Sequence, residues 1–513
     1  KIKAHLFPRK HIFLEPVHQS QRNKKRTHKE EFKMGESDNN GKVSREEEEQ
    51  PLSPAARLFH SPSFNCYIIA ILGCNTKFKP DVIKSGLEQT LLKHPRFSSK
   101  LVADDGQRWT KTIVDLEDHV IVPDLDPNID FADQFAEDYI SDLTTKPMDL
   151  SKPLWELHLL NIKTSDAEAV GVFRIHHSMG DGASLISLLL ACTRKTLDPE
   201  ALPSVPENKR ADSTNSGGFW WFLLAFWSVL RLIWNTLVDV LLFGVTVMFM
   251  KDTKTPIKGA PGVEHNIKKF VHRTISLDDI KLVKNALNMT VNDVVLGITQ
   301  AGLSQYVNRR YGEAEIDEGE KQRKSNLPKS IRLRATILVN LRPTVGIQAL
   351  ANMMEKGSKT RWGNLIGYIL LPFTIALQDD PLDYVRKAKA TIDRKKRSLE
   401  SICTFSGGVL VLRTFGVKVA AALTHKVLSN TTMAFSSMVG PLEEISFYGH
   451  PLAYIAPSVY GHPHALTIHY QSYVNKMTIA LAVDPNVIPD PYQLCDDLEE
   501  SLKLIHDAIL KKV

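Results

Sequence analysis

Short apolar runs alternate with amphipathic segments along most of the chain, which predicts a mixed α/β fold. The run FNCYIIAILG at 64–73 reads as a buried strand, and PDVIKSGLEQTLLKHP at 80–95 has helical apolar spacing before a proline stop. A predicted strand at 169–177 is followed directly by an apolar helix at 183–196. Further strands are predicted at 269–275, 331–343, 431–441, 465–474 and 476–485, and further helices at 291–310, 381–400 and from Pro491.

Polar segments divide this pattern into two α/β parts. Residues 1–50 are polar and charged, so we expect a disordered N-terminal extension. A linker rich in Pro, Ser and Asn at 197–218 follows the first set of strands and helices. At 513 residues the chain exceeds one ordinary core, which favours two units. The expected segments are a first α/β subdomain at 51–205, a linking region at 206–262 and a second α/β subdomain at 263–513.

The composition argues against two classes of protein. The formal net charge is +6, but residues 1–33 carry ten Lys and Arg against three Glu, which leaves −1 for the rest. The body therefore lacks the basic stripe of a nucleic-acid-binding protein. We expect Met34 to be the natural start and residues 1–33 not to be native. The five cysteines are scattered without a C-x-x-C pair, which predicts a reducing compartment and neither a zinc site nor a disulfide framework.

The segment FRIHHSMGDG, which ends at Gly182, concentrates chemistry at the end of a predicted strand. Successive side chains of a strand point to opposite faces, so His176 and His177 cannot both face one small site. This argues against a metal held by two imidazoles and favours a single working histidine with a buried, supporting neighbour. Gly180 and Gly182 allow a tight turn with unusual dihedral angles, and Asp181 can brace that turn.

A neutral imidazole in this turn can act as a general base. Its ordinary pKa of roughly 6.5 lets it accept a proton near neutral pH, and such a base adds about 10²–10⁴ in rate. The chain has no G-x-S-x-G, G-x-x-x-x-G-K-[ST], G-x-G-x-x-G or H-E-x-x-H motif. A histidine base without a nucleophile, a phosphate-binding loop or a metal site suits direct transfer from an already activated acyl donor. The alternative is a structural histidine, which is the usual role of a lone histidine on a strand.

The segment HHSMGDG resembles the HHxxxDG signature of CoA-dependent acyltransferases with the chloramphenicol-acetyltransferase-like fold. Further blocks, in the same order, resemble the plant branch of the wax ester synthase/diacylglycerol acyltransferase family. These blocks are PLSPAARLFH (51–60), TVNDVVL (290–296), VNLRP (339–343), WGNLIGYILLPF (362–373) and SSMVGP (436–441). The DFGWG block of the soluble plant acyltransferases is absent, so the resemblance is to the wax ester branch.

The resemblance implies an α/β fold of two chloramphenicol-acetyltransferase-like subdomains, packed with a substrate channel at their interface. His177 would be the general base, and Asp181 would brace its loop. Asn292 and Asp293 match the family's ND pair and would line the channel, the alternative being a helix N-cap. Arg342 is a candidate partner for Asp181, the alternative being an ordinary exposed arginine.

The resemblance also implies the substrates. Long-chain acyl-CoA would be a co-substrate, with no cofactor and no metal, and the acceptor would be a fatty alcohol or diacylglycerol. The histidine would take the alcohol proton during attack on the thioester and return it to the CoA thiolate, without a covalent intermediate. The implied location is the endoplasmic reticulum membrane on its cytosolic face, with the plasma membrane as a second candidate. Chain length, preferred alcohol and oligomeric state stay open.

An aromatic, apolar segment at 219–250 predicts membrane association. A single helix over its 32 residues would be about 48 Å long, more than a hydrocarbon core of about 30 Å needs. Its polar residues recur at intervals of three or four, on one helical face: Ser228, Arg231, Asn235 and Asp239. We expect a helix that lies in or partly enters the membrane, with this stripe toward the enzyme or the headgroups. A spanning helix and a buried core helix are the alternatives.

Two other functions are weighed against this reading. A soluble-type acyl-CoA transferase with a phenolic or amine acceptor would have no use for segment 219–250. A non-catalytic lipid-binding protein on the same fold would not need His177, Asp181 and Gly182 intact. The leading expectation is therefore a membrane-associated long-chain acyl-CoA O-acyltransferase, with the membrane surface as a partner and no nucleic acid.

Overall fold

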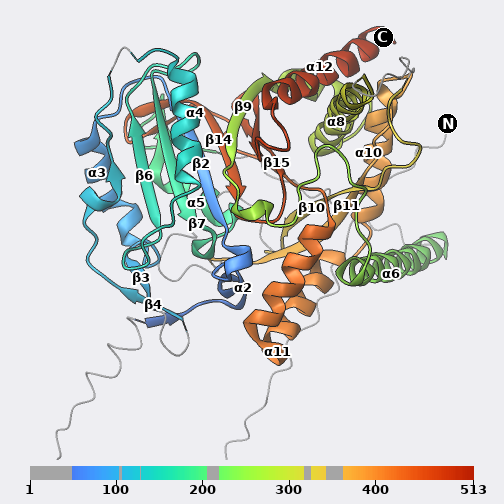
Figure 1. Ribbon diagram of the computed structural model, residues 1–513, viewed down its shortest axis with the longest axis horizontal. Coiled ribbons are helices and arrows are strands. Elements are labelled where there is room, and N and C mark those ends of the chain that lie inside the picture. The colour runs from blue at the N-terminus through green and yellow to red at the C-terminus, as the bar shows by residue number, and fades with distance from the viewer. Residues whose placement is uncertain are drawn as a thin grey trace, which may run out of the picture.

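The computed structural model describes residues 49–102, 107–126, 129–204, 219–316, 325–342 and 362–512. Two large sheets stand side by side with helices packed around them, as Figure 1 shows. This is the mixed α/β fold that the hydrophobic pattern predicted. Of the expected disordered segment 1–50, residues 1–48 lie outside the described part, whereas Glu49–Pro51 form strand β1.

The first sheet has seven strands in the order β5-β6-β7-β2-β14-β13-β8. Its strands are β2 (Tyr67–Cys74), β5 (Val120–Ile121), β6 (Trp155–Leu160), β7 (Ala169–His176), β8 (Thr193–Lys195), β13 (Ile445–Phe447) and β14 (His450–Tyr460). Helices of this half are α2 (Pro54–Leu58), α3 (Pro80–Gln89), α4 (Ala132–Leu143) and α5 (Gly182–Cys192). β1 forms a small separate sheet with β3 (Ser99–Val102) and β4 (Arg108–Lys111).

The second sheet has six strands in the order β11-β10-β12-β15-β16-β9. Its strands are β9 (Lys269–Ser276), β10 (Leu333–Asn340), β11 (Ile366–Phe373), β12 (Met433–Met438), β15 (Leu466–Tyr473) and β16 (Lys476–Val483). Helices α7 (Leu277–Ala286), α8 (Val291–Ile316), α10 (Leu382–Lys395) and α12 (Pro491–Leu510) share one apolar core with alternate residues of these strands. These helices therefore cover one face of the sheet, and the side chains that alternate with the core residues point to the opposite face.

The two sheets do not follow the expected division of the chain at residue 263. Strands β13 and β14 come from the second segment, yet β14 pairs antiparallel with β2 over most of its length. The core of the first half accordingly includes Tyr473, Ala480 and Ala482. A strand's apolar pattern shows that it is buried but not which sheet it joins, so the sequence could not predict this exchange. The exchange of strands β13 and β14 into the first sheet joins the two halves at their interface.

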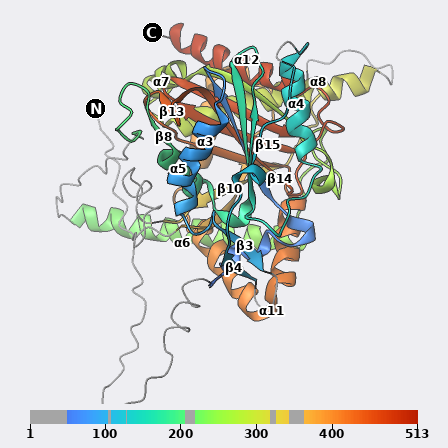
Figure 2. The same ribbon diagram turned by 90° about the vertical axis from the view of Figure 1, so that its left-hand side faces the viewer.

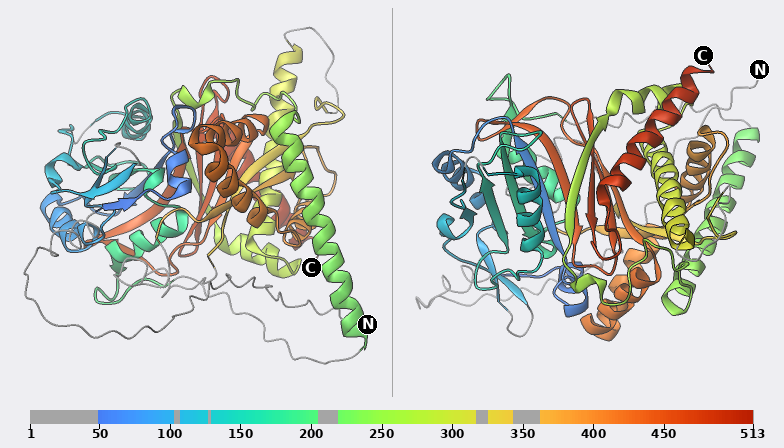
Figure 3. Two further views of the ribbon diagram at one scale, coloured as in Figure 1. Left: turned by 90° about the horizontal axis from the view of Figure 1, so that it is seen from below. Right: turned by 45° about the horizontal axis from the view of Figure 1, so that its top comes forward.

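Helices α6 (Phe219–Met248) and α11 (Glu400–Asn430) pack together on the outside of the second half (Figures 2 and 3). Both are long and apolar enough to cross a membrane by length and composition. α6 is one continuous helix, whereas Gly416, at φ 79° and ψ 175°, breaks α11 into two shorter helices. Their apolar side chains are mostly exposed, so the buried-core-helix alternative for 219–250 is wrong.

Part of the polar stripe predicted on α6 faces the body of the protein. The Asn235 amide donates to the Arg397 carbonyl at 3.0 Å. The Asp239 carboxylate lies 2.8 Å from the Arg394 guanidinium and 3.0 Å from the Lys395 ammonium. Before Asn235, none of the side chains described in α6 is buried. The C-terminal half of α6 is therefore fixed to the protein by these contacts, whereas the described side chains before Asn235 are exposed or half-buried.

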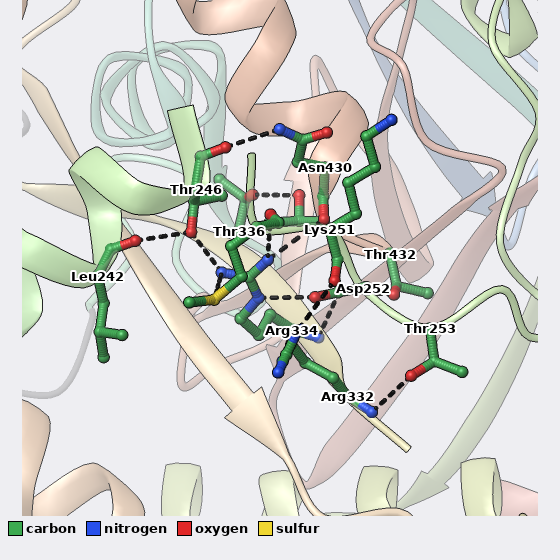
Figure 4. A network of polar contacts seen from close by, with 12 residues as sticks. Leu242, Thr246, Lys251, Asp252, Thr253, Arg332, Arg334, Thr336, Asn430 and Thr432 are labelled. Atoms are coloured by element: carbon green, nitrogen blue, oxygen red, sulfur yellow. Dashed lines mark hydrogen bonds and ion pairs between the residues drawn. The ribbon is translucent and has the colours of Figure 1, made fainter. Parts of the chain in front are cut away.

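A buried polar network fixes the C-terminal end of α6 (Figure 4). The Arg334 guanidinium lies 2.6 Å from the Asp252 carboxylate and also donates to the Thr246 hydroxyl. Asp252 accepts from the Thr432 hydroxyl at 2.7 Å, and the Asn430 amide donates to the Thr246 carbonyl at 2.6 Å. The ends of α6 and α11 and the starts of β10 and β12 thus meet in one hydrogen-bonded cluster.

Candidate active site

The two adjacent histidines lie where strand β7 ends, and a single 3-10 turn begins at His177. His176 is bound through both ring nitrogens, 2.7 Å from the Ser178 hydroxyl and 2.9 Å from the side-chain oxygen of Asn65. The backbone N–H of His177 donates to the Cys66 carbonyl at 2.9 Å. The ring of His176 is thus used to hold the turn, and the ring of His177 is not.

The ring of His177 is buried but free to react. It stacks on Phe59, with the ring centres 4.2 Å apart, and is 4% exposed. Its Nδ1 is buried, and no described residue makes a well-formed hydrogen bond to that nitrogen. Burial lowers the pKa of His177, and its own carbonyl, Asp181 and Asn364 offset only part of that shift. The ring is therefore neutral at pH 7. Among the described residues, no three His, Cys, Asp or Glu side chains gather as metal ligands would.

Asp181 connects the turn to both halves of the protein. One carboxylate oxygen caps α5, accepting the N–H and the hydroxyl of Ser184, both at 3.1 Å. The other accepts from the Arg342 guanidinium at 2.7 Å and from the Leu365 N–H at 2.9 Å. The side chains of Asp181 and Arg342 are each 2% exposed. The predicted pairing of these two residues is confirmed, and the exposed-arginine alternative is wrong.

The glycines of the turn are needed for space rather than for unusual dihedral angles. Neither has φ in the left-handed region, and Gly180 is extended, with φ 177°. The dihedral angles predicted for this turn are therefore wrong. Gly182 is the first residue of α5, and a Cβ there would lie only 2.8 Å from Cε of Met438. A Cβ on Gly180 would lie 3.0 Å from Cβ of Ser184. Because glycine has no side chain, β12 can approach the turn closely.

Three residues that precede β11 close over the turn, and the sequence reasoning assigned them no role. The Trp362 indole donates to the Met179 carbonyl at 2.7 Å, and the Asn364 amide donates to the His177 carbonyl at 3.0 Å. Between them, Gly363 has φ +115°, a conformation that favours glycine, and its carbonyl accepts from Arg342 at 2.6 Å. The signal available in the sequence was the isolated Trp-Gly-Asn triplet just before a strand.

Asn292 and Asp293 lie at the start of α8. Asp293 and Thr290 form a capping box: the Thr290 N–H donates to the carboxylate at 2.9 Å, and the Asp293 N–H donates to the Thr290 hydroxyl at 3.3 Å. Asn292 is exposed and accepts from the Ser437 hydroxyl at 2.9 Å. The cap alternative therefore describes Asp293. Within the described part of the chain, no recorded contact joins either residue to the histidine turn.

Two solved structures have this two-halved fold. One is the wax ester synthase/diacylglycerol acyltransferase from Marinobacter aquaeolei VT8, with a TM-score of 0.55 and 18% identity over 89% of this chain and 98% of that chain. The other is the starter condensation domain of rhizomide synthetase, with a TM-score of 0.51 and 13% identity over 92% of this chain and 97% of that chain. These structures define the fold class, in which two sheet-containing halves meet.

Closer relatives narrow the class. Residues 80–295 match the model of the wax ester synthase/diacylglycerol acyltransferase catalytic domain, and residues 362–506 match that of the WS/DGAT C-terminal domain. Wax ester synthase/diacylglycerol acyltransferase 5 of Arabidopsis thaliana is 60% identical over 91% of this chain and 95% of its own length. Wax ester synthase/diacylglycerol acyltransferase 11 of the same plant is 56% identical over 91% of this chain and 96% of its own length. The chain belongs to the wax ester synthase/diacylglycerol acyltransferase family and is an acyltransferase.

Proposed function

We propose that this protein is a membrane-associated long-chain acyl-CoA O-acyltransferase that esterifies fatty alcohols to wax esters and diacylglycerol to triacylglycerol. The observation that carries the proposal is the neutral ring of His177, buried where the two halves meet, with an Nδ1 that has no well-formed partner among the described residues. Asp181 from one half and Arg342 and Asn364 from the other hold its turn in place. Such a ring supplies the base that direct acyl transfer needs.

His177 acts as the general base. It accepts the hydroxyl proton of the acceptor as the acceptor oxygen bonds to the thioester carbonyl carbon, whose π electrons move onto the carbonyl oxygen. When that electron pair returns, the carbon–sulfur bond breaks, and His177 gives its proton to the departing CoA sulfur. Burial raises the pKa of the neighbouring Cys66 thiol far above its usual range, so this side chain offers no thiolate nucleophile. The transfer therefore proceeds without an acyl-enzyme.

The substrates follow from this chemistry and from the family. The thioester of acyl-CoA is the activated donor that a base without a nucleophile requires, and the rhizomide synthetase domain, which has the same fold, was solved with C8-CoA. No separate cofactor or metal enters the reaction. The acceptors are lipids with a free hydroxyl, which reside in membranes and reach the enzyme laterally.

The exposed faces of α6 and α11 form the membrane-binding surface. The part of α6 that precedes Asn235, the first buried residue among its described side chains, is about 24 Å long at 1.5 Å per residue, shorter than a hydrocarbon core of about 30 Å. Since Gly416 breaks α11, neither of its segments reaches spanning length. Both helices therefore enter one leaflet, and we place the protein on the cytosolic face of the endoplasmic reticulum.

Membrane binding is tested with the double variant Trp227→Glu/Trp234→Glu, which places charges on two exposed side chains of α6. Co-sedimentation with phospholipid vesicles should fall at least tenfold, because charge enters hydrocarbon at high cost. Leu504→Glu, on an exposed position of α12, serves as the matched control and should sediment like the original protein. Equal sedimentation of all three proteins would contradict the proposed surface.

The reaction is tested with purified full-length protein and labelled palmitoyl-CoA, offered hexadecanol, diacylglycerol or a phenolic alcohol separately. We expect labelled wax ester and triacylglycerol and no phenolic ester. His177→Ala should lower the rate by about 10²-fold or more while leaving the fold intact. His119→Ala, at another buried histidine, controls for loss of packing. Full activity in a folded His177→Ala protein would refute the assignment of the base.

A further inference from the structure

A second buried histidine lies on the wall of the second sheet that faces away from the helices. Along β15, Ile468 and Tyr470 belong to the helix-covered core, so His469 between them points to the opposite face. Its neighbours across the strands on that face are Ser436 of β12 and Ala480 of β16. Both neighbours are small, so they leave room beside the imidazole.

This face meets the first half of the protein. Ala480 joins the core of the first half, and Met438, at the end of β12, packs against Gly182 in the histidine turn. Burial and, to a smaller extent, the charge that His177 can carry together lower the pKa of His469 to about 4. An effect of this kind requires the two rings to be near each other. The two neutral imidazoles therefore stand on opposite sides of the interface between the halves.

The ring of His469 has unused hydrogen-bonding capacity. It is 8% exposed, its Nδ1 is buried, and no described residue bonds to either ring nitrogen. The two buried histidines nearby differ in this respect. His462 lies 3.1 Å from the Thr467 hydroxyl, and His464 lies 2.9 Å from the Thr431 hydroxyl, each through Nε2, so these two rings lack a partner at Nδ1 only. Leaving a buried polar ring without a partner is energetically unfavourable, which points to a ligand that completes it.

We propose that His469 is a second catalytic residue, whose N–H donates a hydrogen bond to the carbonyl oxygen of the acyl thioester. This inference rests on the proposed function. The attacking oxygen lies beside His177 while its proton is removed, so the carbonyl oxygen lies on the far side of the reacting carbon. Negative charge builds on that oxygen when the new carbon–oxygen bond forms and leaves it when the carbon–sulfur bond breaks. A donor on the opposite wall stabilises this charge.

The neutral state of His469 suits this role. A neutral imidazole has one N–H to donate, and its lowered pKa keeps it neutral at pH 7. It neither takes the acceptor proton nor supplies one, so the proton balance of the transfer stays with His177. The two histidines thus have separate tasks, proton transfer and charge stabilisation.

The test compares three variants of the full-length enzyme. His469→Leu removes the donor and should lower kcat by about 10²–10³-fold, with KM for palmitoyl-CoA and hexadecanol changed less than about threefold. His469→Gln keeps an N–H donor and should retain kcat within about tenfold of the original. His464→Gln is the matched control, because its ring is buried nearby but already bonded, and it should keep full kcat. Thermal unfolding of each variant shows that it is folded.

Two results would overturn the inference. One is a kcat in folded His469→Leu equal to that of the original, and the other is an equal loss of kcat in His464→Gln. If the leucine variant does not fold, His469→Phe replaces it, since it keeps a ring but has no donor, and kcat should fall as for leucine. The acidic limb of the pH–rate profile should stay in every variant, and its loss in His469→Gln would show that His469 is the base instead.

The experiment also separates this inference from the proposed function. An active, folded His177→Ala protein means that the proposed function itself has failed. An inactive His177→Ala protein together with a fully active His469→Leu protein means that only the role of His469 has failed.

Discussion

Replacing Asp181 with asparagine should destabilise the protein and the reactive turn together. The carboxylate accepts four hydrogen bonds, from Ser184 twice and from Arg342 and Leu365. An asparagine has the same shape but one oxygen, so its NH₂ group must face N–H donors on one side. The Arg342 guanidinium, 2% exposed, also loses its countercharge.

The size of the effect follows from this burial. Breaking one partner of a buried ion pair costs about 3–5 kcal/mol, because the remaining charge is left uncompensated. For a unit of roughly 200 residues, that lowers the melting temperature by on the order of 10 °C. The turn that carries His177 loses its connection to Leu365, so kcat per folded molecule should also fall, by about tenfold or more.

The matched control is Asp252→Asn. Asp252 forms an equally buried pair with Arg334, at 2.6 Å, in the network at the end of α6. This variant should lose similar stability, whereas kcat per folded molecule should change much less than in Asp181→Asn, because Asp252 is not bonded to the turn itself. Thermal unfolding and the palmitoyl-CoA assay measure both quantities. An Asp181→Asn protein with an unchanged melting temperature but no activity would refute a bracing role and indicate direct contact with the substrate.

Two further predictions concern pH and backbone conformation. Burial lowers the pKa of His94 and of His469 to about 4, so the folded protein binds fewer protons than the unfolded chain between about pH 6.5 and 4. The free energy of unfolding should keep its full value above about pH 6.5 and fall as the pH drops through that window, by on the order of 2 kcal/mol per histidine at about pH 5. A melting temperature that rises on acidification would contradict this expectation. Gly363→Ala, at φ +115°, should cost about 1–3 kcal/mol, whereas Gly244→Ala, in the open part of α6, should be neutral or stabilising by up to about 1 kcal/mol, as urea unfolding can measure.

Much of the fold could be predicted because strands and helices have local signatures. The apolar run before Cys74 and the one before His176 are strands β2 and β7, and the helix predicted from residue 183 begins at Gly182. The partner of β14 could not be predicted, because sheet order depends on contacts between residues nearly 400 positions apart. Helix α11 was missed because its small and polar residues, with glycines at 407, 408 and 416, hide the helical period.

The residues of the candidate site could likewise be predicted only in part. His177 and Asp181 belong to one short motif, and the charge of Arg342 made it a candidate partner before the structure confirmed the pair. Asn364 was missed because it acts through its amide on a backbone carbonyl 187 residues away, which no periodicity signals. His469 was missed because it lies in a strand whose other residues are ordinary core residues.

The network around Arg334 connects the two exposed apolar helices, α6 and α11, through β10 and β12 to the turn that carries His177. β10 and β12 are adjacent parallel strands that begin at this network, and beyond their far ends lie the contact of Arg342 with Asp181 and that of Met438 with Gly182. A tilt of α6 imposed by bilayer curvature or lateral pressure would therefore load both strands from the same end. If α6 and α11 bind a bilayer, as we propose, the geometry around the His177 imidazole would then differ between a flat and a strongly curved membrane.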